Sequence, residues 1–168
     1  MEATIYKVQI DGPGRLAICP RPRGGDWLDD DVAALAQKGV GVLVSLLCPD
    51  EARDLGLQDE VAVCAQHNIE FISLPVPDMC APDEESDFIA EVHRLARLVR
   101  GGASVAVHCR QSIGRSGLLA VSIAIASGFE LEMALDGVSA ARGLPVPETR
   151  EQVNWLRRNA GRLSLPPT

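Results

Sequence analysis

An unbroken unit between residues 104 and 126 limits the folds that are open to this chain. An apolar run of strand length, Ser104 to His108, leads into a short polar turn, and Gly117 to Ala126, a segment that is apolar on nearly every side, follows the turn. A helix without a polar face is buried. We therefore expect a strand that leads into a helix running through the centre of the molecule.

Apolar runs of strand length alternate with segments of helical period along the rest of the chain. This alternation predicts an α/β fold with a central, mostly parallel sheet of about five strands flanked by helices, and the continuous apolar character of the runs predicts that both faces of the sheet are covered. The expected strands are Ile5 to Ile10, Arg15 to Cys19, Val40 to Leu47, Glu70 to Val76 and Ser104 to His108. The expected helices are Asp29 to Gln37, Asp59 to His67, Glu84 to Val99, Gly114 to Ser127, Leu131 to Arg142 and Thr149 to Leu163.

Length and charge narrow the class of protein. A chain of 168 residues suits one domain, because two would each have a thin core, so we expect residues 1–168 to form a single domain. No apolar stretch reaches the roughly 20 residues of a membrane helix and no segment has the pattern of a signal peptide, so we expect a cytoplasmic protein that does not bind membranes. The formal net charge of −7 repels nucleic acid.

Cysteine and histidine are scattered along the chain. They occur at Cys19, Cys48, Cys64, Cys80 and Cys109 and at His67, His93 and His108. An odd number of widely spaced cysteines without a leader argues against a disulfide framework. The lack of close spacing among these side chains argues against a zinc site. We expect no structural disulfide and no bound metal.

The polar turn after the strand predicts an anion site. Residues 105–117 read VAVHCRQSIGRSG. A turn between a buried strand and a helix points backbone N–H groups and the N-terminus of the helix at one spot, which suits a phosphate dianion. The same groups stabilise a thiolate at Cys109, which makes it a nucleophile. Arg115, six residues later, can fold back and donate two parallel hydrogen bonds to the phosphate, and Ser116 can hydrogen-bond the sulfur.

The pattern His108-Cys109-x5-Arg115-Ser116 resembles the phosphate-binding loop of the protein tyrosine phosphatase superfamily. The resemblance implies the fold of the cysteine-dependent phosphatases and a reaction without a cofactor, in which a cysteinyl-phosphate forms and is then hydrolysed. We expect His108 to have a supporting role, as a hydrogen-bond donor that steadies the loop of the nucleophile. The implied phosphate-binding residues are Arg110, Gln111, Ser112, Ile113, Gly114 and Arg115.

Two further segments fit the resemblance. The family places an acidic aspartate on a mobile upstream loop, and here Leu74-Pro75-Val76-Pro77-Asp78 ends 31 positions before Cys109, so Asp78 is the implied general acid. The family also tends to have a glutamine near the start of a late helix. Gln152 matches this glutamine, and the resemblance implies that it orients the hydrolytic water. Thr149-x-x-Gln152 is in addition a capping box, so a purely structural role for this glutamine stays open.

The resemblance covers roughly residues 27–163 and is strongest to the compact dual-specificity group, in particular the cyclin-dependent-kinase-associated phosphatases and their bacterial relatives. It implies hydrolysis of phosphotyrosine, phosphoserine or phosphothreonine in a protein or peptide by an enzyme that we expect to be a monomer. Phosphoinositides or other small phosphates are the first alternative, although the loop offers only Arg110 besides Arg115 for a highly charged headgroup. Sulfur transfer of the rhodanese type is disfavoured by Asp78.

Three departures or unassigned features accompany this interpretation. Ser112 stands where the family usually has glycine, and if that position needs a positive φ the serine costs on the order of 1 kcal/mol. This keeps a non-catalytic phosphoresidue-binding module as an alternative. Cys48, after a strand, is a candidate redox partner of the nucleophile, and a bridge to a different cysteine, such as Cys80, would refute this pairing. Arg21 and Arg23 either line a substrate groove or belong to a solvated loop.

Overall fold

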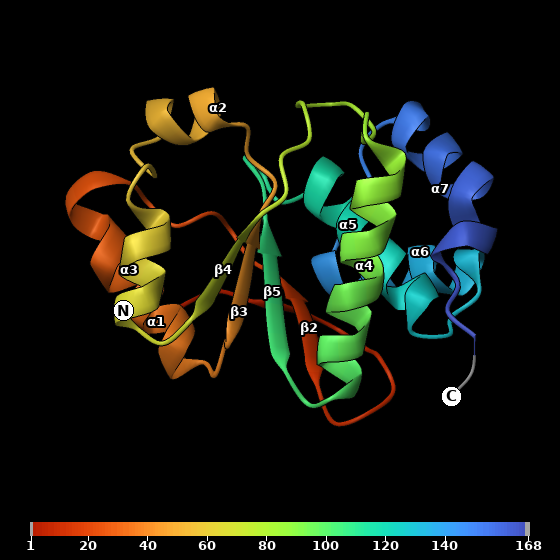
Figure 1. Ribbon diagram of the computed structural model, residues 1–168, viewed down its shortest axis with the longest axis horizontal. Helices are drawn as coiled ribbons and strands as arrows, with labels where there is room; N and C mark the ends of the chain where they lie inside the picture. The colour runs from red at the N-terminus through yellow and green to blue at the C-terminus, as the bar shows by residue number, and fades with distance from the viewer. Residues whose placement is uncertain (1, 167–168) are drawn as a thin grey trace.

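The computed structural model describes residues 2–166, and its strands form one five-stranded sheet of order β1-β2-β5-β3-β4 (Figure 1). The strands are β1 (Tyr6–Val8), β2 (Arg15–Ile18), β3 (Val42–Ser45), β4 (Glu70–Ser73) and β5 (Ser104–His108). Strand β1 pairs antiparallel with β2, and the other neighbours pair in parallel. The predicted α/β fold with a mostly parallel central sheet is confirmed.

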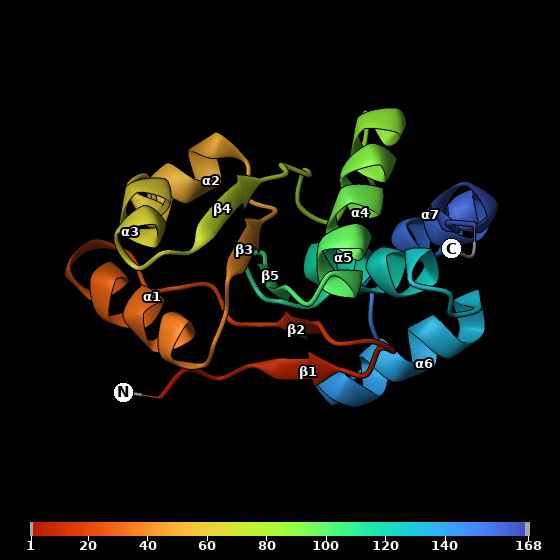
Figure 2. The same cartoon turned by 60° about the horizontal axis from the view of Figure 1, so that its bottom comes forward.

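Helices cover both faces of this sheet, as the apolar strands predict (Figure 2). They are α1 (Leu28–Gln37), α2 (Pro49–Asp54), α3 (Glu60–Gln66), α4 (Glu85–Arg100), α5 (Gly114–Ala126), α6 (Leu131–Arg142) and α7 (Arg150–Leu163). Alternate side chains of β3 show the division. Leu43 belongs to the apolar cluster formed with α1 and α3, whereas Val42 and Val44 belong to the cluster formed with α4, α5, α6 and α7.

Helix α5 runs through the centre of the molecule, and every one of its residues is buried. It contacts α4, α6 and α7 as well as β2 and β5, which confirms the expected central helix. Gly117 permits one close approach, because a Cβ at this position would lie 2.8 Å from the Cβ of Val146. The first turn of α5, and with it the loop before the helix, therefore packs tightly against the segment that leads to α7.

The structure differs from the sequence prediction after β3. The sequence predicts a strand from Val40 to Leu47, whereas β3 ends at Ser45 and an unpredicted helix, α2, begins at Pro49. Proline favours the first helical position because its missing N–H is not needed there. Helix α2 has six residues and none of them is buried, so its sequence has no apolar stripe from which a helix could be predicted.

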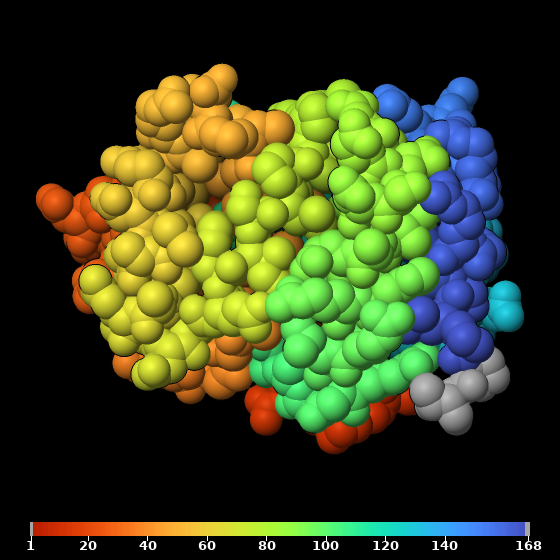
Figure 3. Space-filling model, in the orientation of Figure 1, coloured from red at the N-terminus to blue at the C-terminus, as the bar shows by residue number. Residues whose placement is uncertain are grey.

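The edge of the sheet departs from expectation in a second way. Strand β4 pairs with a neighbour on one side, and its terminal residues, Glu70 and Ser73, are exposed, so this strand is less covered than its apolar sequence predicts. Figure 3 shows the face on which α3, β4 and α4 lie next to one another. Among residues 2–166, no helix has both the length and the apolar composition required to cross a bilayer.

Candidate active site

The loop between β5 and α5 places Cys109 at the carboxyl end of a central strand, where α/β sheets usually bind ligands (Figure 1). Cys109 is 3% exposed, and its Sγ lies 3.1 Å from Oγ of Ser116 in the first turn of α5. The chain turns from strand to helix within five residues, so the N-terminus of α5 faces the space beside the sulfur. The structure thus brings together the predicted nucleophile and its predicted hydrogen-bond partner.

The side chain of Arg115, in α5, has a partner that the sequence analysis does not identify, Glu51 of α2. The two side chains form a two-pronged ion pair, with Nη1 donating to Oε2 at 2.7 Å and Nη2 donating to Oε1 at 2.9 Å. Nη1 also donates to the carbonyl of Val76 at 2.9 Å. Hydrogen bonds from Arg115 lower the pKa of Glu51 despite its partial burial. Because the guanidinium is 1% exposed, these contacts fix both its charge and its orientation.

The predicted acid, Asp78, lies on the loop after β4 and reaches the same guanidinium. Its Oδ1 is 3.1 Å from Nη2 of Arg115 and also accepts the backbone N–H of Met79 at 3.0 Å. Met79 has a φ of +64°, so the loop turns sharply directly after the aspartate. The side chain of Asp78 is 54% exposed, in contrast to the buried arginine that it contacts.

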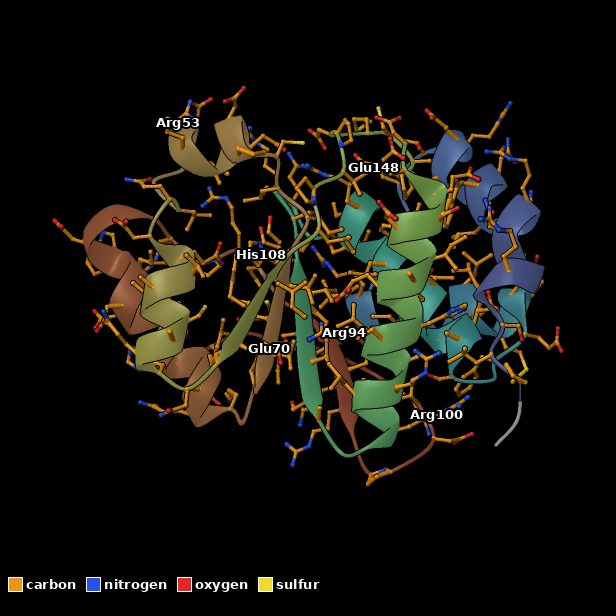
Figure 4. All side chains as sticks on the ribbon, in the orientation of Figure 1. Arg53, Glu70, Arg94, Arg100, His108 and Glu148 are labelled. Atoms are coloured by element: carbon orange, nitrogen blue, oxygen red, sulfur yellow. The ribbon has the colours of Figure 1, made fainter. Side chains whose placement is uncertain are left out.

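A small cavity of about 100 Å³ collects these groups. Its lining residues are Asp78, Met79, Cys109, Gln111, Gly114, Arg115 and Glu148. Glu148 is a second carboxylate that the sequence analysis does not identify, and Figure 4 places it at the end of the molecule toward which the parallel strands point. Nε of Arg115 is buried and has no hydrogen-bond partner within residues 2–166. A buried donor of this kind is costly unless an acceptor reaches it, and a phosphate oxygen is such an acceptor.

Ser112, which stands where the family usually has glycine, adopts the positive φ that we expect this position to need. Its φ is +58°, in the left-handed region, and its side chain is buried. The hydroxyl donates to the carbonyl of Cys19 after β2, and the Ser112 carbonyl accepts Nε–H of Arg142 at 2.8 Å. These contacts hold the loop in the turn that glycine would otherwise adopt more easily. The loop between β5 and α5 therefore forms its turn with serine at this position.

His108 lies beneath the loop and pairs with a buried acid. It is fully buried, its Nε2 lies 2.8 Å from Oε1 of Glu60, and its Nδ1 lies 3.4 Å from the carbonyl of Cys109 (Figure 4). Glu60 is itself only 2% exposed, in the first turn of α3. A hydrogen-bonded pair of this kind fixes the imidazole and links α3 to the end of β5. The role of His108 in steadying the loop stays a prediction.

Gln152 is completely buried, and both ends of its amide are bonded. Its Oε1 accepts the backbone N–H of Thr149 at 3.1 Å, as in the predicted capping box, and its Nε2 donates to the carbonyl of Cys80 at 3.1 Å. These bonds tie the start of α7 to the loop that carries Asp78. A role in orienting water stays a prediction.

Cys48 lies directly before α2 and is half-buried, with its backbone N–H donating to Oε2 of Glu51 at 3.0 Å. Burial, followed by the charge of Glu51, raises the pKa of the Cys48 thiol. All five cysteines are free thiols in this structure. Redox pairing of Cys48 with the nucleophile stays a prediction. No group of three histidine, cysteine, aspartate or glutamate side chains within residues 2–166 could hold a metal ion.

Comparison with known proteins decides the family. Residues 19–129, more than half of the chain, match the family described as "Tc-R-P: Polymorphic toxin system, DSP-PTPase phosphatase". The chain belongs to this phosphatase family. Its predicted resemblance to the compact dual-specificity group of the protein tyrosine phosphatase superfamily is confirmed. A comparison with curated proteins finds no match.

Solved structures of other phosphatases have folds similar to that of this phosphatase. Kinase associated phosphatase (KAP), with its catalytic cysteine replaced by serine, has a TM-score of 0.85 and 17% identity over 97% of both chains. Tk-PTP in its active form has a TM-score of 0.75 and 27% identity over 94% of this chain and 97% of its own. PTPMT1 in complex with PI(5)P has a TM-score of 0.71 and 17% identity over 94% and 96%, respectively.

Proposed function

We propose that this phosphatase hydrolyses phosphate monoesters on protein side chains through a cysteinyl-phosphate on Cys109. One observation carries the proposal: the Cys109 thiol, the Arg115 guanidinium and the Asp78 carboxylate line a single small cavity. A nucleophile, an anion clamp and an acid that line one small cavity are the parts that phosphoryl transfer requires. The likeness to KAP and Tk-PTP supports the same reaction class.

In the first step, the thiolate of Cys109 attacks phosphorus in line with the ester oxygen. The S–P bond forms while the P–O bond breaks, and Asp78 donates a proton to the departing oxygen. Arg115 uses Nε and the Nη2 hydrogen that faces Asp78 for the equatorial oxygens, since Nη1 is committed to Glu51 and the Val76 carbonyl and the other Nη2 hydrogen is committed to Glu51. The loop N–H groups and the N-terminus of α5 stabilise the charge on the same oxygens.

In the second step, water attacks phosphorus and the S–P bond breaks, which releases inorganic phosphate and returns the thiolate. Asp78 accepts the proton of the water. Ser116 donates a hydrogen bond from its hydroxyl to the leaving sulfur and so stabilises the thiolate, for which its 3.1 Å separation from Sγ is suitable. We assign Gln152 a positioning role in this step, because its amide joins α7 to the loop of the acid.

Protein substrates are favoured over phosphoinositides by the sparse charge of the loop, which has Arg110 and Arg115 but no lysine. The solved complex of PTPMT1 with PI(5)P keeps lipid substrates as the second candidate. Retention of the loop turn at Ser112 argues for catalysis over a module that only binds phosphoresidues.

Several other expectations from the sequence stay predictions. They are that the protein is a single domain, that it is a cytoplasmic monomer, that it needs no cofactor or metal, and that it binds neither nucleic acid nor membranes.

The proposal predicts different outcomes for two variants. Cys109→Ser should abolish turnover of p-nitrophenyl phosphate and of a phosphopeptide while the circular dichroism spectrum is unchanged. Asp78→Asn should lower kcat about 10²–10⁴-fold for alkyl and tyrosyl esters but much less for p-nitrophenyl phosphate, because a good leaving group needs little protonation. Retained turnover in Cys109→Ser would exclude this nucleophile, and an equal loss for all leaving groups would exclude the acid role of Asp78.

A further inference from the structure

The catalytic cavity holds one more carboxylate than the proposed reaction uses. Among residues 2–166, its lining includes two acidic side chains, Asp78 and Glu148, and one cation, Arg115. Asp78 enters the proposed reaction as the acid, so it is protonated when the phosphate binds. The charge of Glu148 has no such role. A carboxylate that lines a phosphate site repels the dianion, and this repulsion is unfavourable unless another charge offsets it.

Glu148 has no cationic partner in the part of the chain that the structure describes. It is exposed, and within residues 2–166 its side chain forms neither an ion pair nor a hydrogen bond. Arg115 is not free to neutralise it, because this guanidinium pairs with Glu51 and contacts Asp78. Other arginines line a separate groove of about 320 Å³ and not the catalytic cavity; they are Arg21, Arg23, Arg110 and Arg142. The charge that offsets Glu148 therefore has to come from the substrate.

Glu148 lies at the rim of the phosphate site. A Cβ at Gly114 would lie 3.2 Å from Oε2 of Glu148, and Gly114 is the first residue of α5. The carboxylate is therefore beside the helix N-terminus that binds phosphate oxygens in the proposed reaction, and it competes with them for the same partial charge. Glu148 and Cys109 line one cavity of about 100 Å³, so any substrate that reaches the nucleophile comes close to this carboxylate.

An apolar side chain lies next to this carboxylate. Met79 lines the same cavity and is 48% exposed. The hydroxyl of Thr149, the residue after Glu148, donates to the carbonyl of Met79 at 3.4 Å, which places the two segments side by side. Lysine and arginine combine an apolar stem with a cationic end. A side chain of this kind can pack its stem on Met79 and pair its cationic end with Glu148.

We propose that Glu148 is a specificity-determining residue, and that the preferred substrates are peptides with a lysine or an arginine close to the phosphorylated residue. This inference rests on the proposed function. The phosphate binds at Arg115 and the loop, while the cationic end of the nearby side chain pairs with Glu148. The net charge of −7 attracts such cationic peptides at long range as well. The same carboxylate disfavours phosphoinositides, which bring further negative charge.

The test compares phosphopeptides that differ at one position. Each peptide carries one phosphotyrosine in an alanine background, with arginine, alanine or glutamate at one position from three before to three after it. For the wild type we expect kcat/KM to be about three- to fivefold higher with arginine than with alanine in at least one register, and lower with glutamate. The preference should shrink in about 0.5 M NaCl, because salt screens the ion pair.

Two variants with the same change in net charge separate the effect of Glu148 from that of the charge of the whole protein. Glu148→Gln should remove the preference for arginine. It should also lower KM for p-nitrophenyl phosphate, which brings no cation, because the dianion is no longer repelled. Glu132→Gln, at an exposed position of α6, should retain the preference. Binding of the same peptides to Cys109→Ser should give the same order of affinities as the wild-type kcat/KM.

Three results would overturn the inference. The wild type could show no preference for arginine in any register, the preference could persist in Glu148→Gln, or Glu132→Gln could reduce the preference as much as Glu148→Gln does. Turnover of p-nitrophenyl phosphate by the wild type is measured in parallel. Its absence would contradict the proposed function, whereas its presence without a preference for arginine would contradict only the role of Glu148.

Discussion

Arg115 lies between two carboxylates that differ in exposure and therefore in freedom to move. The Glu51 side chain is 17% exposed and bonds both terminal nitrogens, whereas the Asp78 side chain is 54% exposed and contacts one of them. We infer that Glu51 holds the guanidinium in place throughout the reaction. In the proposed reaction, Asp78 leaves the guanidinium when phosphate arrives and turns to the leaving group.

Replacing Glu51 by glutamine tests this anchor through its pH dependence. The folded-state pKa of Glu51 is lowered, so its contribution is complete above the ordinary value of about 4.3 and is lost as pH falls through the folded-state pKa. At pH 7, Glu51→Gln should lower the free energy of unfolding by on the order of 3 kcal/mol, because Arg115 loses its charged partner. Urea titrations from pH 3 to pH 8 should show this difference constant above about pH 5 and shrinking below about pH 4. A difference that does not change with pH would contradict the ion pair.

Ser112 offers a second test at this scale. Ser112→Ala keeps the strained φ of +58° and loses the hydroxyl bond to Cys19, so we expect a loss of stability of about 1–2 kcal/mol and a lower kcat. Ser112→Gly loses the same bond but relieves the strain, so it should lie within about 1 kcal/mol of the wild type. Thermal unfolding of the two variants measures the difference. Equal stabilities would mean that the backbone is not strained at Ser112.

At the scale of elements, the site depends on how α5 meets its neighbours. The loop that holds Cys109 ends where α5 begins, and Gly117 in the first turn of this helix allows Val146 to approach. Helix α2 supplies Glu51 and α3 supplies Glu60, so elements from the other face of the sheet complete the site. A shift of α5 would therefore move the loop that holds Cys109.

Gly117→Ala probes this packing, with Gly137→Ala in α6 as its matched control. A Cβ at Gly117 would lie 2.8 Å from Val146, so we expect a loss of about 1–3 kcal/mol and reduced turnover. A Cβ at Gly137 would meet nothing within 4 Å, and alanine there should stabilise α6 by about 0.5–1 kcal/mol. Chemical denaturation separates the two. Stabilisation by both substitutions would contradict the close contact.

At the scale of the whole molecule, local patterns predict the sheet and its helices except α2, and the segment around Cys109 and Arg115 is predicted because strand, loop and helix are contiguous. The partner of Arg115 is different: Glu51 is 64 positions away and lies on a helix too short to have an apolar stripe. Glu60 and Glu148 are likewise brought to the site only by the fold. The family resemblance identifies Asp78, but composition and periodicity alone would leave it as a turn residue.

The central claim, that Cys109 becomes covalently phosphorylated, is tested most directly by rapid acid quench during turnover of a phosphopeptide, followed by mass spectrometry of the digested enzyme. Phosphate should be found on the peptide that contains Cys109 and should be absent from the same peptide of Cys109→Ser. Phosphate on another residue, or turnover by the wild type without any phosphorylated enzyme, would contradict the account.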